Sequence, residues 1–187
     1  KIEKLITRYN TIVLGGNYLG GLFKPHYHCF VNKKRFTEYI DTVEPESKLL
    51  IGQYITDEMI KEYTGRDYEK IYYIDSYADF QIEENGLITT NCRTVSVLLA
   101  GVAIAMGAKR IFCVGMDGYI GQENKGFHFY SEKEEQDDKD MILERHLWNQ
   151  KFIEQIDGYL IGRGKEGLHI LTPTSYKSFY KGIDNYI

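Results

Sequence analysis

The sequence of 187 residues holds only three cysteines, Cys29, Cys92 and Cys113. No two of them form a CxxC pair, and an odd number cannot be used up in disulfides within one chain. We interpret them as reduced core residues of a cytoplasmic protein, since Cys29 and Cys113 lie in predicted strands. His26 and His28 share one face of a strand, but no cysteine or carboxylate completes a zinc site with them, so we predict no metal.

Long apolar runs are also missing. The longest apolar stretch, Thr94 to Met106, is too short to span a membrane and is interrupted by Ser96 and Gly101. No secretory signal peptide is recognisable. The first residue is Lys1 rather than methionine, so we expect the chain to be a piece of a longer protein, with a further domain fused before it.

The GxGxxG fingerprint of dinucleotide-binding folds is absent. The first predicted strand, residues 11–14, runs into Gly15-Gly16-Asn17, and the glycines of this region are at positions 15, 16, 20 and 21. This spacing disfavours NAD and FAD. The glycines still allow a ligand to approach the backbone closely, and the alternative interpretation is a tight turn without a ligand.

Charge is mild overall but unevenly distributed. The net charge is −4, whereas residues 1–36 hold seven Lys and Arg against a single Glu. The basic part includes the loops after the first two predicted strands, which favours a small anionic ligand. Nucleic acid is disfavoured, because the overall charge is negative and no known nucleic-acid module is visible. The alternative is ordinary solvation of a protein surface.

Short β-branched runs alternate with helical patterns along the chain. Strands are predicted at 11–14, 27–31, 48–51, 70–74, 111–114 and 168–171. Helices are predicted up to Arg8, at 33–43, from a Thr56 cap to Tyr63, from Thr94 to Met106, and from a Ser131–Glu134 capping box to about residue 158. This alternation predicts a single Rossmann-like α/β domain over residues 1–187, with one mostly parallel sheet and helices on both faces.

The most informative stretch runs from Thr89 to Tyr119. A polar segment, Thr89-Thr90-Asn91, precedes the long apolar helix, and Thr90 or Asn91 fits the N-cap position. A helix N-terminus carries unpaired N–H groups and a partial positive charge, which suits a phosphate. The strand at 111–114 ends in Gly115-Met116-Asp117-Gly118-Tyr119, a turn at the sheet edge where open α/β folds bind ligands.

Several of these motifs occur together in known proteins. They are Gly16-Asn17 after the first strand, Asn32 at the end of the second, Thr89-Thr90-Asn91 before the apolar Val102–Gly107 region, the Gly115–Tyr119 turn, and the last strand with its Thr172-Pro173-Thr174-Ser175 exit. The combination resembles the bacterial sialyltransferases of the Campylobacter type, over roughly residues 10–180. It is also similar to the 6-hydroxymethylpterin pyrophosphokinase-like group. A third relative is a domain found behind aldolase-like barrels in surface-polysaccharide loci, to which Asp117-Gly118-Tyr119 looks closest.

The resemblance implies a Rossmann-like fold that binds a nucleotide or nucleotide-sugar, with a CMP-sugar as donor substrate and no other cofactor. The expected nucleotide-binding residues all lie at a strand exit or a helix start: Gly15, Gly16, Asn17, Asn32, Thr89, Thr90, Asn91, Gly115 and Asp117. Asparagine offers both a donor and an acceptor, which suits a base edge, a ribose or a phosphate. The alternative is that the asparagines and Asp117 only stabilise turns. We expect these residues to converge on one cleft.

Sugar transfer requires a base that takes the proton from the acceptor hydroxyl. In the sialyltransferases a histidine precedes the long helix, but the equivalent positions near Asp140–Glu144 hold none. His128, in the aromatic loop between residues 116 and 131, is therefore the candidate base. Tyr119 and Tyr130 are candidates to protonate or hydrogen-bond the leaving phosphate. His146, inside the last long helix, is interpreted as a half-buried structural residue.

The predicted function is a nucleotide-sugar-dependent, sialyltransferase-like glycosyltransferase of surface-polysaccharide and lipopolysaccharide biosynthesis. One alternative is a pyrophosphokinase-like phosphoryl transferase, which uses Mg²⁺ and ATP and needs a second carboxylate beside Asp117. Another is a non-catalytic nucleotide- or sugar-binding module attached to an aldolase-like or transferase domain. The sequence leaves open the donor sugar, the acceptor and any assembly into homo-oligomers.

Overall fold

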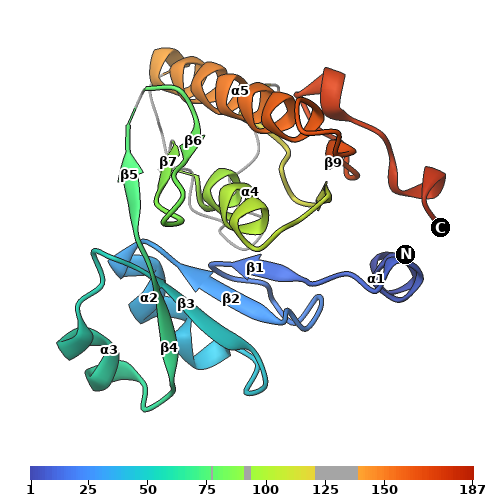
Figure 1. Cartoon of the computed structure of the whole chain (residues 1–187). Helices are drawn as coiled ribbons and strands as arrows, with labels where there is room; N and C mark the ends of the chain where they lie inside the picture. The colour runs from blue at the N-terminus through green and yellow to red at the C-terminus, as the bar shows by residue number, and fades with distance from the viewer. Residues whose placement is uncertain (77, 91–93, 121–138) are drawn as a thin grey trace.

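The computed structural model describes residues 1–76, 78–90, 94–120 and 139–187 (Figure 1). The helices are α1 (Ile2–Tyr9), α2 (Lys33–Tyr39), α3 (Asp57–Tyr63), α4 (Val95–Ala105) and α5 (Lys139–Ile161), with short 3-10 helices η1 (Ile40–Thr42), η2 (Lys177–Phe179) and η3 (Ile183–Asn185). The strands are β1 (Leu14–Gly16), β2 (Tyr27–Phe30), β3 (Lys48–Gly52), β4 (Tyr68–Ile71), β5 (Tyr73–Asp75), β6 (Gln81–Ile82), β7 (Ile88–Thr90), β8 (Arg110–Cys113) and β9 (Gly167–Ile170). Among these helices, none has the combination of length and apolar character that crossing a membrane requires.

The α/β class and the parallel pairing are confirmed, but the prediction of one continuous sheet is wrong. Strands β1-β2-β3-β4 form a parallel four-stranded sheet, β5-β7-β6 form a second sheet, and β8-β9 form a parallel pair. The predicted strand at 70–74 is divided at Tyr72, and its two halves belong to different sheets. The predicted strand at 11–14 is also displaced, since β1 begins at Leu14 and includes the two glycines.

The division of the strand has a visible cause in Gln53, the residue that follows β3. Its side-chain Nε2 donates to the carbonyl of Tyr73 at 2.9 Å, and the Tyr73 N–H donates to its Oε1 at 3.2 Å. The amide therefore takes the place of a neighbouring strand and ends the pairing with β3 at Ile71. Beyond this point the chain is directed to β7, where Tyr73 lies opposite Ile88.

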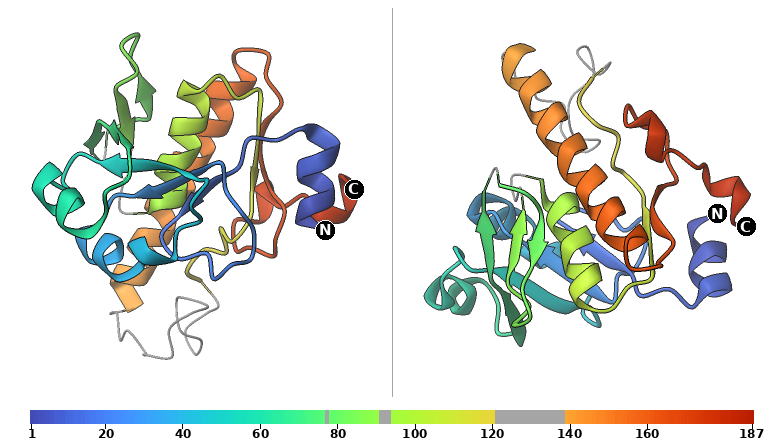
Figure 2. Two further views of the ribbon diagram at one scale, coloured as in Figure 1. Left: turned by 90° about the horizontal axis from the view of Figure 1, so that it is seen from below. Right: turned by 45° about the horizontal axis from the view of Figure 1, so that its top comes forward.

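Helices cover both faces of the four-stranded sheet, as predicted (Figure 1). On one face, Phe30 and Ile51 pack with Phe36 of α2 and Ile60 of α3. On the other face α4 lies against the sheet, and α5 covers α4 from outside (Figure 2). Successive side chains of β2 and β3 point to opposite faces of the sheet and so belong alternately to the two cores. Burial of both faces is typical of a parallel sheet.

An aromatic cluster joins the two ends of the chain, which lie side by side in Figures 1 and 2. The Arg110 guanidinium lies 5.3 Å from the ring centroids of both Tyr9 and Phe112 and forms an ion pair with Glu166. The Tyr186 ring packs on Phe112 at 5.0 Å. These contacts hold α1 and the C-terminal segment against β8.

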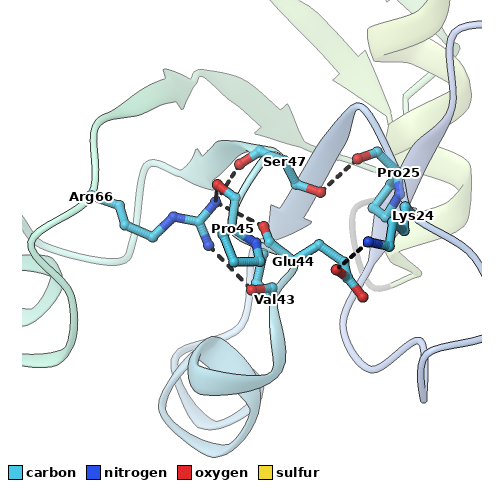
Figure 3. A network of polar contacts seen from close by, with 7 residues as sticks. All are labelled: Lys24, Pro25, Val43, Glu44, Pro45, Ser47 and Arg66. Carbon is cyan, nitrogen blue, oxygen red and sulfur yellow. Dashed lines mark hydrogen bonds and ion pairs between the residues drawn. The ribbon is translucent and has the colours of Figure 1, made fainter.

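Arg66 fixes the connection between α2 and β3 (Figure 3). Its guanidinium donates to the carbonyls of Val43, Glu44, Pro45 and Ser47. The hydroxyl of Ser47 in turn donates to the carbonyl of Pro25, in the loop that leads to β2. One planar, five-donor side chain thereby satisfies a group of carbonyls that no strand or helix pairs.

We predict that Arg66→Lys lowers the free energy of unfolding by about 1–3 kcal/mol, because an ammonium cannot reproduce the fork of donors. Urea denaturation measures the loss. Arg8→Lys is the matched control, since this exposed guanidinium lies only over the Tyr9 ring. A stability of Arg66→Lys equal to that of Arg8→Lys would contradict the assignment.

Candidate functional site

The carboxyl end of β1 meets the first turn of α4. A Cβ atom added to Gly16 would lie 3.0 Å from both γ-methyl carbons of Val95. A Cβ on Gly15 would lie 2.6 Å from a methyl carbon of Leu19 and 3.2 Å from Pro25. Protein packing therefore favours glycine at both positions, and the close approach of the backbone is to α4 and to the loop that follows β1.

Asn17 adopts a left-handed conformation with φ of 55°. Its N–H donates to the carbonyl of Cys29 at 3.1 Å, and its own carbonyl accepts from His28 Nε2 at 2.6 Å. The side-chain Oδ1 is buried and has no hydrogen-bond partner within the described part of the chain. A buried acceptor without a partner is unusual in folded proteins.

Asn32 does not present its side-chain oxygen to the same place. It is the N-cap of α2, and its Oδ1 accepts from the Arg35 N–H at 3.1 Å. This bond is the ordinary stabilising role of asparagine at a helix start. The alternative interpretation of Asn32 as a structural residue accounts for its contacts.

The threonines before α4 have different roles from those predicted. Thr89 and Thr90 belong to β7 and are buried, so the prediction of Thr90 as the N-cap is wrong. Asn91, the other candidate cap, lies outside the described residues. The N-cap is Thr94, whose side chain forms no cap bond. The sequence pattern predicted only a polar segment before the helix at this place. The structure has the short strand β7 instead, because Thr89 and Thr90 pair with β5.

The Thr94 hydroxyl is instead directed to α5. Its Oγ1 lies 2.9 Å from Nδ2 and 3.1 Å from Oδ1 of Asn149, and 3.5 Å from the Tyr119 hydroxyl. The Thr94 side chain thus caps no N–H group of α4, although the Thr94 carbonyl accepts from the Val97 N–H at 3.1 Å, and its hydroxyl joins α4, α5 and the turn after β8. The N-terminus of a helix is suited to an anion.

The Gly115–Tyr119 turn is held by the segment that follows β9. Gly115 N–H donates to Thr172 Oγ1 at 3.0 Å, and the carbonyl of Asp117 accepts from the Ser175 N–H at 2.8 Å. Gly118 has φ of 82°, and a Cβ there would collide with Ser175 Oγ. These bonds use the backbone of Asp117 and leave its carboxylate exposed. Partial burial raises the pKa of the Asp117 carboxyl above its usual value.

His146 lies against the Gly115–Tyr119 turn, a position that the sequence interpretation did not predict. It is 3% exposed rather than half-buried, and its ring stacks on Tyr176 with centroids 4.5 Å apart. Nδ1 accepts from the Tyr119 N–H at 3.4 Å. Burial lowers the pKa of His146, which favours the neutral imidazole that such an acceptor needs.

A sequence signal for His146 and Asn149 does exist. Both occur on the buried stripe of α5, which also includes Ile142, Phe152, Ile153, Ile156 and Leu160. Polar residues on an otherwise apolar helical stripe must find partners inside the protein. Here those partners are Tyr119 and Thr94, so the helical spacing of two polar residues indicates the site.

The residues predicted at strand exits are thus brought together in part. Gly16 lies against Val95 in the first turn of α4 and the Tyr119 hydroxyl lies 3.5 Å from Thr94 Oγ1, whereas Asn32 is used as a helix cap. His128 and Tyr130 lie outside the described residues, and their roles stay predictions. Among the described residues, no three His, Cys, Asp or Glu side chains cluster in a way that could hold a metal ion.

Comparison of the chain with protein-family models, with curated proteins and with solved structures finds no significant match. The resemblance to the sialyltransferases therefore stays a prediction from scattered motifs.

A separate polar hollow of about 370 Å³ lies beside the ends of β3 and β4. It is lined by Gln53, Thr56, Asp57, Glu58, Tyr68, Lys70 and Tyr72. Lys70 Nζ lies 3.0 Å from Asp57 Oδ1 and also donates to the carbonyl of Ile55. Lys70 and Asp57 are thus engaged with each other, and the sequence interpretation assigned none of the lining residues to a site.

We predict that Asn17→Ala lowers the free energy of unfolding by about 1–2 kcal/mol, because alanine is strained in a left-handed conformation. Asn17→Gly should lose less than about 1 kcal/mol, since glycine adopts this conformation without strain. Thermal unfolding of the two variants measures the difference. Equal stability of the Ala and Gly variants would show that residue 17 does not have this backbone conformation.

Proposed function

We propose that this domain binds a nucleotide-sugar at the first turn of α4 and transfers the sugar, as a sialyltransferase-like glycosyltransferase with a CMP-sugar donor in surface-polysaccharide biosynthesis. The observation that carries the proposal is the meeting of three segments at one helix start. They are Gly16 at the end of β1 with the following Asn17, Thr94-Val95 at the start of α4, and the turn that ends at Tyr119. The first and third were expected at a ligand edge from the motifs, whereas before α4 the motifs indicated Thr89, Thr90 and Asn91.

The donor phosphate is assigned to the N-terminus of α4. This helix has 11 residues, and its N-cap side chain is engaged with Asn149 and caps none of the first-turn N–H groups. The helix dipole adds a partial positive charge at the same end. We assign the Tyr119 hydroxyl, which lies 3.5 Å from Thr94 Oγ1, as a donor to a phosphate oxygen there. We assign Asn17 to the nucleoside as an acceptor for a hydroxyl or amino group, which requires its buried Oδ1 to turn outward when the ligand binds.

In the proposed reaction, a base takes the proton of the acceptor hydroxyl, whose oxygen forms the new bond to the anomeric carbon of the sugar. The bond to the phosphate oxygen breaks, and CMP leaves with the electron pair. His128 remains the proposed base, and Tyr130 a proposed donor to the leaving phosphate. His146 is assigned a different role, since its Nδ1 already accepts from Tyr119 N–H and its burial keeps it neutral. We assign it to positioning of Tyr119.

We predict that CMP raises the melting temperature of the unmodified protein and that Mg²⁺ does not change the effect. A ligand present at 100 times its dissociation constant should stabilise the fold by about 2.7 kcal/mol. A thermal-shift panel of CMP, CDP, UDP, GDP and ATP, each with and without Mg²⁺, is the measurement. A response to ATP that depends on Mg²⁺ would favour the phosphoryl transferase instead, and no response to any nucleotide would overturn both enzyme functions.

A second prediction concerns the base. His128→Ala should abolish sugar transfer while nucleotide affinity stays nearly unchanged, because the base acts on the acceptor hydroxyl. Transfer from a CMP-sugar and the dissociation constant for CMP are measured on the same preparation. His26→Ala is the control, since His26 is exposed and bonds to Val13 N–H at the amino end of β1.

The outcomes separate the functions. Equal loss of affinity and transfer in His128→Ala would make His128 a ligand contact. Nucleotide binding by the unmodified protein without transfer or hydrolysis of any donor would favour a binding module over an enzyme.

A further inference from the structure

We propose that His28 is a positioning residue that sets the backbone of Asn17, and with it the orientation of the segment Asn17–Leu22, for the ligand. The proposal deepens the function above and rests on it for the ligand. His28 itself is 2% exposed and lies on β2, one strand away from β1. It therefore acts through Asn17 rather than by touching a substrate.

Both backbone groups of Asn17 are bonded to β2. The Asn17 N–H donates to the carbonyl of Cys29 at 3.1 Å, which continues the ladder between β1 and β2 by one residue. The Asn17 carbonyl has no strand partner and accepts instead from His28 Nε2 at 2.6 Å. The imidazole thus supplies the last hydrogen bond of the β1 edge, at the residue where the chain turns into the left-handed conformation.

The position of the His28 ring is set by its surroundings. It stacks on Phe30, two residues along the same face of β2, with centroids 4.9 Å apart and planes 20° apart. Phe30 is fully buried against Phe36 of α2. The donor that reaches Asn17 is consequently attached to the core beneath the sheet rather than to a mobile loop side chain.

The protonation state of His28 follows from its contacts. A carbonyl can only accept, so Nε2 carries the hydrogen, and the neutral ring leaves Nδ1 bare. Nδ1 is buried without a partner in the described residues. Burial lowers the pKa of His28 and the Arg66 guanidinium lowers it further, although the Asn17 carbonyl opposes them. Neutral His28 donates its one ring hydrogen to the Asn17 carbonyl. This role differs from that of a general base, which accepts a proton.

Loss of this donor should change residue 17 more than the rest of the sheet. A buried carbonyl without a donor is unfavourable, and rotation of the Asn17–Tyr18 peptide is the simplest way to return it to water. This rotation changes ψ of Asn17 and φ of Tyr18, and it thereby redirects the segment that continues to Leu22. His28 therefore couples the core on one face of the sheet to the segment that leaves its edge.

The test compares variants that differ in the donor. His28→Phe keeps a ring against Phe30 but removes the donor, whereas His28→Gln keeps an N–H donor. His26→Leu is the matched control, because it removes a histidine–backbone bond at the opposite end of β1. Two quantities are measured for each protein: amide hydrogen exchange at Asn17 and Leu22, and the dissociation constant for CMP.

We expect His28→Phe to accelerate exchange at Asn17 and Leu22 and to weaken CMP binding about threefold to tenfold, the factor that corresponds to one net hydrogen bond. His28→Gln should restore both values toward those of the unmodified protein. His26→Leu should leave exchange at these two amides unchanged. If His28→Phe fails to fold, His28→Leu removes the same donor with less volume and is compared in its place.

The two readouts separate this proposal from the proposed function. Exchange reports on the backbone without any ligand, so accelerated exchange with rescue by glutamine supports the positioning role even if CMP does not bind. Unchanged exchange in His28→Phe, or a glutamine variant as perturbed as the phenylalanine variant, would overturn the positioning role whatever CMP does.

Discussion

The arrangement of this protein depends on one helix that is apolar on nearly every side. α4 reads VSVLLAGVAIA, and Val97, Leu98, Ala100, Gly101 and Val102 are buried. A helix without a polar face must be covered all round. The four-stranded sheet covers it from one direction, α5 from another, and β7 and β8 from the sides (Figure 1). The close packing of Ile88 on Gly101, where a Cβ would lie 3.1 Å from the isoleucine methyl, shows how tightly β7 is drawn in.

The same constraint assembles the candidate site. Elements that must cover α4 necessarily place their ends near the ends of α4, and its N-terminus is the one with unpaired donors. Gly16 reaches Val95 because no side chain separates β1 from the helix. Asn149 reaches Thr94 because α5 packs on α4 along its buried stripe. Hydrophobic burial thereby brings polar groups from three distant parts of the sequence to one helix start.

Asn17 and the Asp117 turn are held through their backbones, whereas Thr94, Asn149 and Tyr119 are joined through their side chains. The Asp117 turn is bonded through its carbonyl to the segment after β9, and Asn17 is bonded through its N–H and carbonyl to β2. The Asp117 side chain is left exposed, and Asn17 Oδ1 is buried without a hydrogen-bond partner in the described residues. A site built on bonded backbone and free side chains is preorganised, which lowers the entropy lost when a ligand binds.

Local patterns determined much of this structure. The β-branched runs determined most strands, Thr56 determined the start of α3 by accepting from Met59 N–H, and the uniform apolarity of 95–105 determined a buried helix. The same patterns placed Gly16, Asn17 and Asp117 at the ends of strands. These features follow from interactions between residues close in sequence, so they could be read without the fold.

Tertiary structure alone decided the rest. The bonds of Gln53 to Tyr73 end β4 and separate β5 from the four-stranded sheet. Thr94 rather than Thr90 is the N-cap of α4, because Thr90 pairs with β5 as part of β7. His146 and His28 acquired their partners, Tyr119 and Asn17, only once α5 lay on α4 and β1 on β2. Each of these outcomes depends on which distant group supplies a hydrogen bond in the buried interior, and local sequence contains no information about that partner until the chain has packed.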